Sequence, residues 1–152
     1  MKRLSAVLFA IIALSSCGTT NLYYWGDGQN INMANTSKYE SRLYDFYNKQ
    51  TPDSYCELLC VYENMTSHPS GSRGVVPPGI CAEYGYLLLK EGGAEMFANN
   101  ASNRQMKAMG GNISPDGFRE KAMEMFKMEM ELYPESRTFI APIIERLGGN
   151  KQ

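Results

Sequence analysis

The sequence SPDGFREKAMEMFKMEMELYP, residues 114–134, decides the fold class of this chain of 152 residues. It begins as helices do, with an N-cap serine, a proline at the first helical position and an aspartate near the positive end of the helix dipole. Apolar side chains then recur every three or four residues, as on the buried face of an amphipathic helix. These inward positions are Phe118, Ala122, Met125, Phe126, Met130 and Tyr133. Pro134 ends the helix, because proline lacks the N–H that the next turn needs.

The chain from residue 36 onward repeats this helical pattern, and no segment alternates between apolar and polar residues as a strand does. We predict helices over about residues 36–49, 51–67, 77–91, 114–133 and 136–147. Residues 94–114 form a long insert rich in Asn, Gly, Ala and Met, in which we expect one short helix near 101–109. The predicted fold is therefore all-α, with about five main helices.

Four residues of the third and fourth predicted helices favour a close helical hairpin. Gly85 lies in mid-helix, where glycine costs about 1 kcal/mol relative to alanine and so needs a packing reason. Ala122, Phe126 and Pro134 stand at the spacing of the small, aromatic and proline positions in the second helix of a tetratricopeptide repeat, and Gly85 matches its first helix. The turn is about 25 residues longer than in that repeat, an insertion with a modest loop-closure cost. An irregular helical bundle is the alternative.

The first residues have the three-part layout of a signal peptide. Lys2 and Arg3 give a positive start, residues 4–14 form an apolar run, and LSSC at 14–17 has the pattern of a lipobox. The apolar run is too short to span a bilayer. In a lipobox the cysteine thiol is joined to diacylglycerol, and cleavage leaves Cys17 as the N-terminus. We expect a signal peptide at 1–16, a lipid anchor and tether at 17–35, and a helical domain at 36–150.

The charge balance points to the same attachment. The chain has 15 basic and 16 acidic residues, and cleavage would remove Lys2 and Arg3, leaving 13 basic against 16 acidic side chains. This balance argues against nucleic-acid binding and against a polybasic grip on anionic lipid, so acyl chains on Cys17 would hold the protein. Because Gly18 and not aspartate follows the cysteine, we expect the outer membrane, with the body facing the periplasm.

An aromatic cluster, LYYWG at 22–26, follows the anchor closely. Tyrosine and tryptophan are stable at the lipid headgroup level, so the cluster could lie in the membrane interface. It could also pack onto the helical body as an N-terminal cap. We favour packing, because the bulky residues are contiguous and end in a turn glycine.

These features together resemble a family of small bacterial lipoproteins of unknown function. The resemblance rests on the lipobox, on LYYWG, on PPGI at 77–80 followed by AEYGYLLL at 82–89, and on a tail with Phe126, Glu129, LYPES at 132–136 and Phe139. Members are often encoded beside a curli-secretion-pore-like lipoprotein of the CsgG type and a third small lipoprotein. The resemblance implies a shared complex of the cell envelope, and it carries over no activity. The long insert, Cys56 and Cys60 depart from the family pattern.

The sequence shows no arrangement of catalytic groups. His68 is the only histidine and lies in a turn-rich stretch, and neither a nucleophile elbow nor a phosphate loop is present. We therefore expect a protein that is not an enzyme and holds no cofactor.

Sulfur-containing residues offer an alternative function. Cys56, Cys60 and Cys81 could be buried thiols, could form one disulfide from Cys81 to Cys56 or Cys60, or could bind a metal. Soft thioether ligands for Cu(I) could come from the insert or the fourth helix: Met106, Met109, Met123, Met125, Met128 and Met130. The alternative is thus a periplasmic lipoprotein that responds to copper, zinc or redox state, although Met125 and Met130 also fit the buried face.

Protein binding fits the predicted fold best. Stacked helical hairpins present a concave face, formed by the first helix of each hairpin, that suits a peptide or another subunit. Tyrosines on such a face supply contact area at a low entropic cost. The candidate binding residues are Tyr44, Tyr47, Glu83, Tyr86 and Lys90. We expect a non-enzymatic scaffold or subunit that binds another envelope protein, with the CsgG-type lipoprotein as the partner that the resemblance implies.

Overall fold

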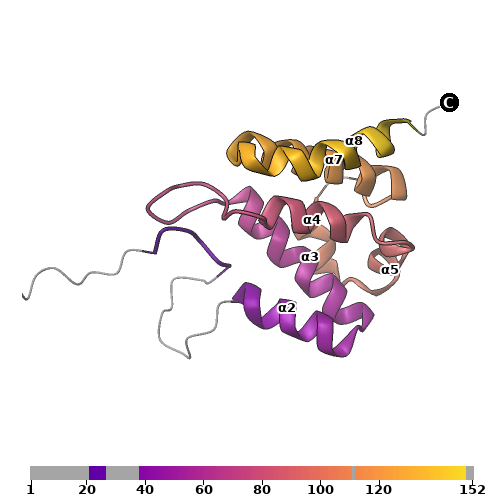
Figure 1. Cartoon of the computed structure of the whole chain (residues 1–152). Coiled ribbons are helices and arrows are strands. Elements are labelled where there is room, and N and C mark those ends of the chain that lie inside the picture. The colour runs from indigo at the N-terminus through magenta and orange to yellow at the C-terminus, as the bar shows by residue number, and fades with distance from the viewer. Residues whose placement is uncertain (1–20, 27–37, 111, 150–152) are drawn as a thin grey trace, which may run out of the picture.

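The computed structural model describes residues 21–26, 38–110 and 112–149, which form seven α-helices, one short 3-10 helix and no strand (Figure 1). The predicted all-α fold is confirmed. The helices are α2 Lys38–Lys49, α3 Pro52–Ser67, α4 Ile80–Leu88, α5 Gly93–Asn100, α6 Asn103–Met109, α7 Pro115–Leu132, the 3-10 helix η1 Pro134–Ser136, and α8 Arg137–Gly149. The predicted signal peptide, Cys17 and most of the tether lie outside the described residues. Within the described part, no helix is both long enough and apolar enough to cross a bilayer.

Each main helix packs on the next to form a row in the order α2, α3, α4, α7 and α8 (Figure 1). Two of them have side-chain N-caps, and the one at Ser114 was predicted. Thr51 and Ser114 accept hydrogen bonds from backbone N–H groups in the first turns of α3 and α7, and a proline follows each cap. The largest contact in the row joins α4 to α7. Buried apolar side chains from α3, α4 and α7 make up most of the core.

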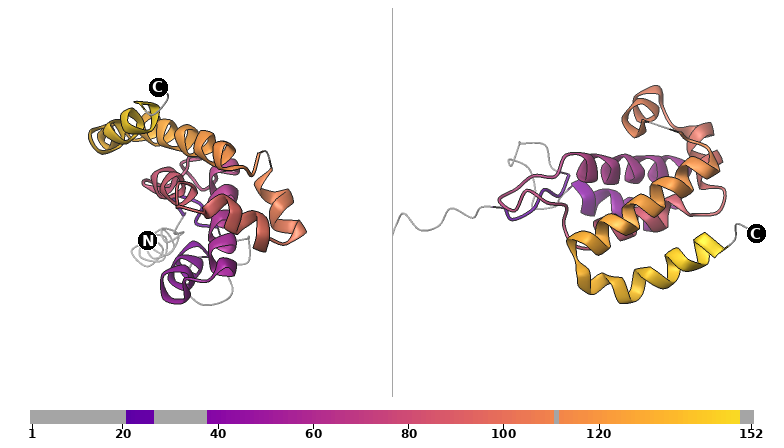
Figure 2. Two further views of the ribbon diagram at one scale, coloured as in Figure 1. Left: turned by 90° about the vertical axis from the view of Figure 1, so that its right-hand side faces the viewer. Right: turned by 90° about the horizontal axis from the view of Figure 1, so that it is seen from above.

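The insert holds two short helices, and only the second was predicted. Helix α6 lies close to the expected position, capped by Ser102. Helix α5 was missed because its sequence is rich in glycine and asparagine. It forms because Phe97 is fully buried and Gly93 fits against the hydroxyl of Tyr55. These are tertiary contacts, and the helix propensities of the residues do not predict them. Both helices pack beside α3, off the main row (Figure 2).

Helix α4 begins later than predicted, at Ile80 and not at Pro77. Gly79 has a φ of 85°, in the left-handed region, so the helix cannot start before the residue that follows it. The cap of α4 comes from another helix, since Oε1 of Glu129 in α7 accepts a hydrogen bond from the Gly79 N–H at 2.7 Å. A carboxylate here satisfies a free N–H group and lies at the positive end of the helix dipole.

Glu129 is buried, and its second oxygen, Oε2, has no hydrogen-bond partner among the described residues. Burial raises the pKa of Glu129, and the N–H groups of Gly79, Ala82 and Cys81 lower it only in part. The carboxyl group therefore binds a proton more readily in the folded protein than in the unfolded chain.

Helices α4 and α7 approach closely at Gly85. A Cβ atom on residue 85 would lie 2.7 Å from Cε1 of Phe126, whose ring is fully buried. Ala122 is buried in the same helix, one turn before Phe126. The contacts of residue 79 with 129 and of residue 85 with 126 show that the two helices run antiparallel. Pro134 follows the end of α7 and begins η1.

The aromatic segment at 21–26 packs onto the helical body. The Trp25 ring lies 5.6 Å from that of Tyr39, and the rings of Tyr62 and Tyr84 continue the series at 5.8 and 5.7 Å. The Trp25 carbonyl also accepts a hydrogen bond from the Tyr39 N–H, beside the first turn of α2. Four rings thus connect the N-terminal segment to the middle of the core.

Substitution of Gly85 by alanine tests the close approach of α4 and α7. We expect Gly85→Ala to lower the free energy of unfolding by about 1–3 kcal/mol, because the added methyl group overlaps a ring that cannot move away. Gly148→Ala, in α8, is the control, since a Cβ there meets open space. Urea denaturation followed by circular dichroism measures both. Equal stability of the two variants would contradict the assigned packing.

The buried Glu129 predicts a specific pH dependence. Because the pKa of Glu129 is higher in the folded protein than in the unfolded chain, protonation of this group stabilises the fold. The full contribution is present below the ordinary glutamate pKa, about 4.3. This contribution is lost as the pH rises through the raised folded value. Stability of the wild type relative to Glu129→Gln should therefore increase as the pH falls, measured by urea denaturation at several pH values. A wild-type advantage that shrinks on acidification would contradict the burial argument.

Glu129→Ala should lower the free energy of unfolding by about 2–4 kcal/mol, since it leaves the Gly79 N–H without an acceptor and opens a cavity.

Candidate functional site

A groove runs between α2 and α4, with α3 as its floor. Its volume is about 330 Å3. The lining side chains are mostly apolar or aromatic, with one acid and one base: Leu43, Phe46, Tyr47, Leu58, Tyr62, Glu83, Tyr86, Leu87 and Lys90. Leu58 and Tyr62 of α3 are buried beneath it. The groove is therefore open to solvent above a packed floor.

The structure brings together four of the five predicted binding residues. Tyr47 of α2 and Glu83 and Tyr86 of α4 line the groove, as does Lys90, which follows α4. The tyrosines remain accessible, with 67% of Tyr47 and 53% of Tyr86 exposed. Tyr44 is also exposed, at 69%, but it does not line the groove. The periodicity of a single helix could not separate Tyr44 from Tyr47, because that distinction depends on where α4 lies.

Glu83 is fixed in its orientation by two tyrosines. Its Oε2 accepts hydrogen bonds from the hydroxyl groups of Tyr39 at 2.6 Å and of Tyr62 at 2.7 Å. Burial raises the pKa of both Tyr39 and Tyr62, so both keep the protons that they donate. The carboxylate is thereby held at the groove, and Glu83 is an exposed residue. A fixed anion of this kind suits a basic or N–H donor group of a bound partner.

Three apolar residues of the groove, Leu43, Phe46 and Leu87, were not predicted as binding residues. Leu43 and Phe46 have the helical spacing of core positions, and the structure leaves them half-buried. They remain partly accessible because α2 and α4 pack on the same helix, α3, and leave space between them. Their accessibility depends on the distance between α2 and α4, which are far apart in sequence, and the sequence does not give that distance.

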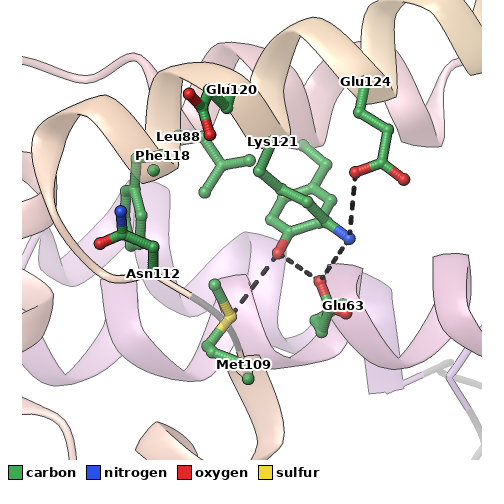
Figure 3. A pocket seen from close by; sticks show the side chains of 11 residues that line it. Glu63, Leu88, Met109, Asn112, Phe118, Glu120, Lys121 and Glu124 are labelled. Carbon is green, nitrogen blue, oxygen red and sulfur yellow. Dashed lines mark hydrogen bonds and ion pairs between the residues drawn. The ribbon is translucent and has the colours of Figure 1, made fainter.

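A second cavity, of about 350 Å3, lies beside α7 (Figure 3). Glu63 accepts hydrogen bonds from the Ser67 and Tyr84 hydroxyl groups, both at 2.7 Å. Lys121 extends between Glu63 and Glu124, at 3.6 and 3.7 Å. Three of the four charged groups of this cavity, Glu63, Lys121 and Glu124, thus bind one another, and nothing in the geometry points to a ligand.

The cysteines have the environment of packing residues. Cys56, Cys60 and Cys81 are free, and Cys56 and Cys81 are buried. Burial raises the pKa of the Cys56 and Cys60 thiols to about 11 and that of Cys81 to about 12. Such thiols stay protonated near neutral pH, whereas metal binding and disulfide exchange require the thiolate. Within the described ranges, no three His, Cys, Asp or Glu side chains are grouped to hold a metal ion.

The methionines and the histidine have equally ordinary surroundings. Met125 is buried, and other methionines of the insert and α7 pack against the core: Met106, Met109, Met128 and Met130. The Sδ of Met109 accepts a weak hydrogen bond from the Tyr84 hydroxyl, at 3.6 Å. His68 is exposed and caps the end of α3 through its backbone.

Comparisons of this chain with protein-family models, with curated proteins and with solved structures find no match.

The burial of the thiols predicts slow alkylation of the folded protein. In a Cys17→Ser background, Cys56 and Cys81 should resist iodoacetamide at pH 8, because almost no thiolate forms and the sulfurs are covered. Cys60, which is partly exposed, should react first. Mass spectrometry counts the labels, and the same protein in urea, where all three react, is the control. Rapid labelling of Cys56 or Cys81 in the folded protein would restore the redox and metal alternative.

Proposed function

We propose that this chain is a non-enzymatic lipoprotein, anchored through Cys17 in the outer membrane and facing the periplasm. Its helical body binds a segment of another envelope protein in the groove between α2 and α4. The groove itself is the observation that carries this proposal, because accessible tyrosines surround an apolar floor beside a fixed carboxylate. The pattern at Cys17 supports the anchor.

The composition of the groove favours a protein over a small molecule. Aromatic residues at the centre and charges at the margin are typical of protein interfaces, in which a few large side chains provide most of the binding energy. Tyr47 and Tyr86 stand on the two helices that form its walls, so a bound segment would contact both. Glu83 and Lys90 would fix its orientation by their opposite charges.

The arrangement of the helices also supports a tetratricopeptide-like body, which is part of the proposal. Helices α2 and α3 form one pair and α4 and α7 a second, with α5 and α6 in the turn of the second pair. In this assignment α2 and α4 are the first helices of their units, which line the concave face of such stacks. The sequence resemblance suggests a CsgG-type lipoprotein as the partner.

Alanine substitutions in the groove test the binding surface. Tyr47→Ala and Tyr86→Ala should each weaken binding of the co-purified envelope partner about tenfold or more, as expected for a central tyrosine. Tyr44→Ala is the matched control, because Tyr44 has a similar exposure on the same helix but lies outside the groove. The measurement is affinity purification of the lipidated protein after crosslinking in cells, followed by titration with the recovered partner.

The Tyr86 ring packs edge-on against Phe126, so the stability of each variant must be measured as well. Loss of binding by variants that remain folded, with binding retained by Tyr44→Ala, would support the groove. Equal binding by all three variants would place the interface elsewhere. Recovery of no partner from crosslinked cells would count against the binding function.

A further inference from the structure

The segment that follows the anchor is bound to a loop of the helical body. The Ser72 and Arg73 N–H groups donate hydrogen bonds to the carbonyl oxygens of Asn21 and Leu22, at 3.0 and 3.1 Å. Figure 1 shows residues 21–26, in indigo, beside the loop between α3 and α4, on the side of the molecule where α3 ends and α4 begins. We call residues 21–24 and 69–74 the anchor edge.

Side chains hold the anchor edge together. The Arg73 guanidinium donates a hydrogen bond to the Tyr23 hydroxyl and lies 5.5 Å from the centre of its ring. Gly71 has a φ of 89°, and a Cβ there would come within 2.7 Å of the Leu22 carbonyl oxygen. Only glycine allows the loop to approach this closely, so the chain after the anchor is fixed to the body at Asn21.

The length of the tether limits where this edge can lie. Asn21 is four residues beyond Cys17 in the sequence. Four residues span at most about 14 Å even when fully extended. An acylated Cys17 lies near the glycerol groups of the lipid, and the polar layer above the hydrocarbon is only about 5–8 Å thick on each side. Asn21, and the loop bound to it, must therefore stay close to the headgroups.

The chemistry of the anchor edge suits that position. Leu22 is 58% exposed, and its carbonyl oxygen is held by a backbone hydrogen bond. Residues 18–26 carry no charge, and no acidic residue occurs between Glu63 and Glu83. Arg73 is the one permanently charged side chain of the edge, and it is basic. An exposed leucine beside an arginine, with no nearby acid in either segment, is compatible with anionic headgroups.

We propose that the anchor edge rests on the lipid headgroups of the membrane that holds Cys17, and that this contact orients the body. The inference depends on the proposed acylation of Cys17. Helix α4 leads away from the edge, and Tyr86, Leu87 and Lys90 of the groove lie at or beyond its far half (Figure 1). The groove is thereby kept off the bilayer and open to an aqueous partner.

Tryptophan fluorescence tests the orientation, because Trp25 is the only tryptophan of the chain. In a Trp25→Phe background, one variant carries Ser70→Trp in the anchor edge and the other carries Ala98→Trp in α5, which lies on the opposite side of the helices from the edge in Figure 1. Both positions are exposed. Each full-length, lipidated protein is placed in vesicles of phosphatidylethanolamine and phosphatidylglycerol that contain a lipid with a nitroxide on its headgroup.

Quenching of Ser70→Trp should be several-fold stronger than that of Ala98→Trp. Equal quenching of the two, or stronger quenching of Ala98→Trp, would overturn the proposed orientation. The unaltered protein gives an independent comparison, because Trp25 lies beside the edge and should also be quenched more than Ala98→Trp. The mass of the Cys17 peptide separates the two proposals: an unacylated cysteine refutes the anchor itself, whereas an acylated protein without differential quenching refutes only the orientation.

Discussion

The Glu129 carboxylate and the missing side chain at Gly85 set the distance between α4 and α7, and the other features depend on that distance. Glu129 gives α4 the N-terminal cap that its own sequence lacks, since the preceding residue is a glycine in the left-handed region. Gly85 lets the same helix approach Phe126 closely. With α4 fixed at its start and at its middle, Tyr84 faces α3 and Tyr86 and Lys90 face the groove. At this buried position the carboxyl group satisfies a backbone donor for which the start of α4 supplies no side-chain acceptor.

Tyrosine–carboxylate pairs then join the rest of the body to α4. Glu63 binds the hydroxyl of Tyr84, while Glu83 binds those of Tyr39 and Tyr62, so each acid connects residues from different helices. The rings of Trp25, Tyr39, Tyr62 and Tyr84, each in contact with the next, follow the same path from the N-terminal segment into the core. Tyr39, one of the two tyrosines that orient Glu83 in the groove, is therefore also the side chain on which Trp25 packs. The segment at 21–26 and the groove are parts of one packed unit.

Much of the fold follows from local signals, and most of the site does not. The caps at Thr51 and Ser114 and the spacing of apolar residues in α7 determine where helices begin and which face is buried, and all of these can be read in the chain. Gly85 predicted a close approach, but the sequence could not tell that Phe126 would meet it. Helix α5 was missed because Phe97 is stabilised by tertiary burial and not by local propensity. The groove depends on the gap between α2 and α4, so a pattern on α2 alone could not exclude Tyr44.

Anchoring and binding reinforce each other in the proposed arrangement. A groove of about 330 Å3, lined by a few tyrosines, buries little surface, and a contact of that size between two soluble proteins would be weak. Two proteins held in the same membrane meet at a much higher effective concentration, so a weak contact suffices between them. That advantage is lost if the tether lets the body rotate freely, because the groove would then face a partner only part of the time. If Cys17 is acylated as proposed, the segment at 21–26 would limit this freedom, since backbone hydrogen bonds and the contact between the Trp25 and Tyr39 rings fix it to the body. In the proposed arrangement, a short tether and a small groove are thus complementary features.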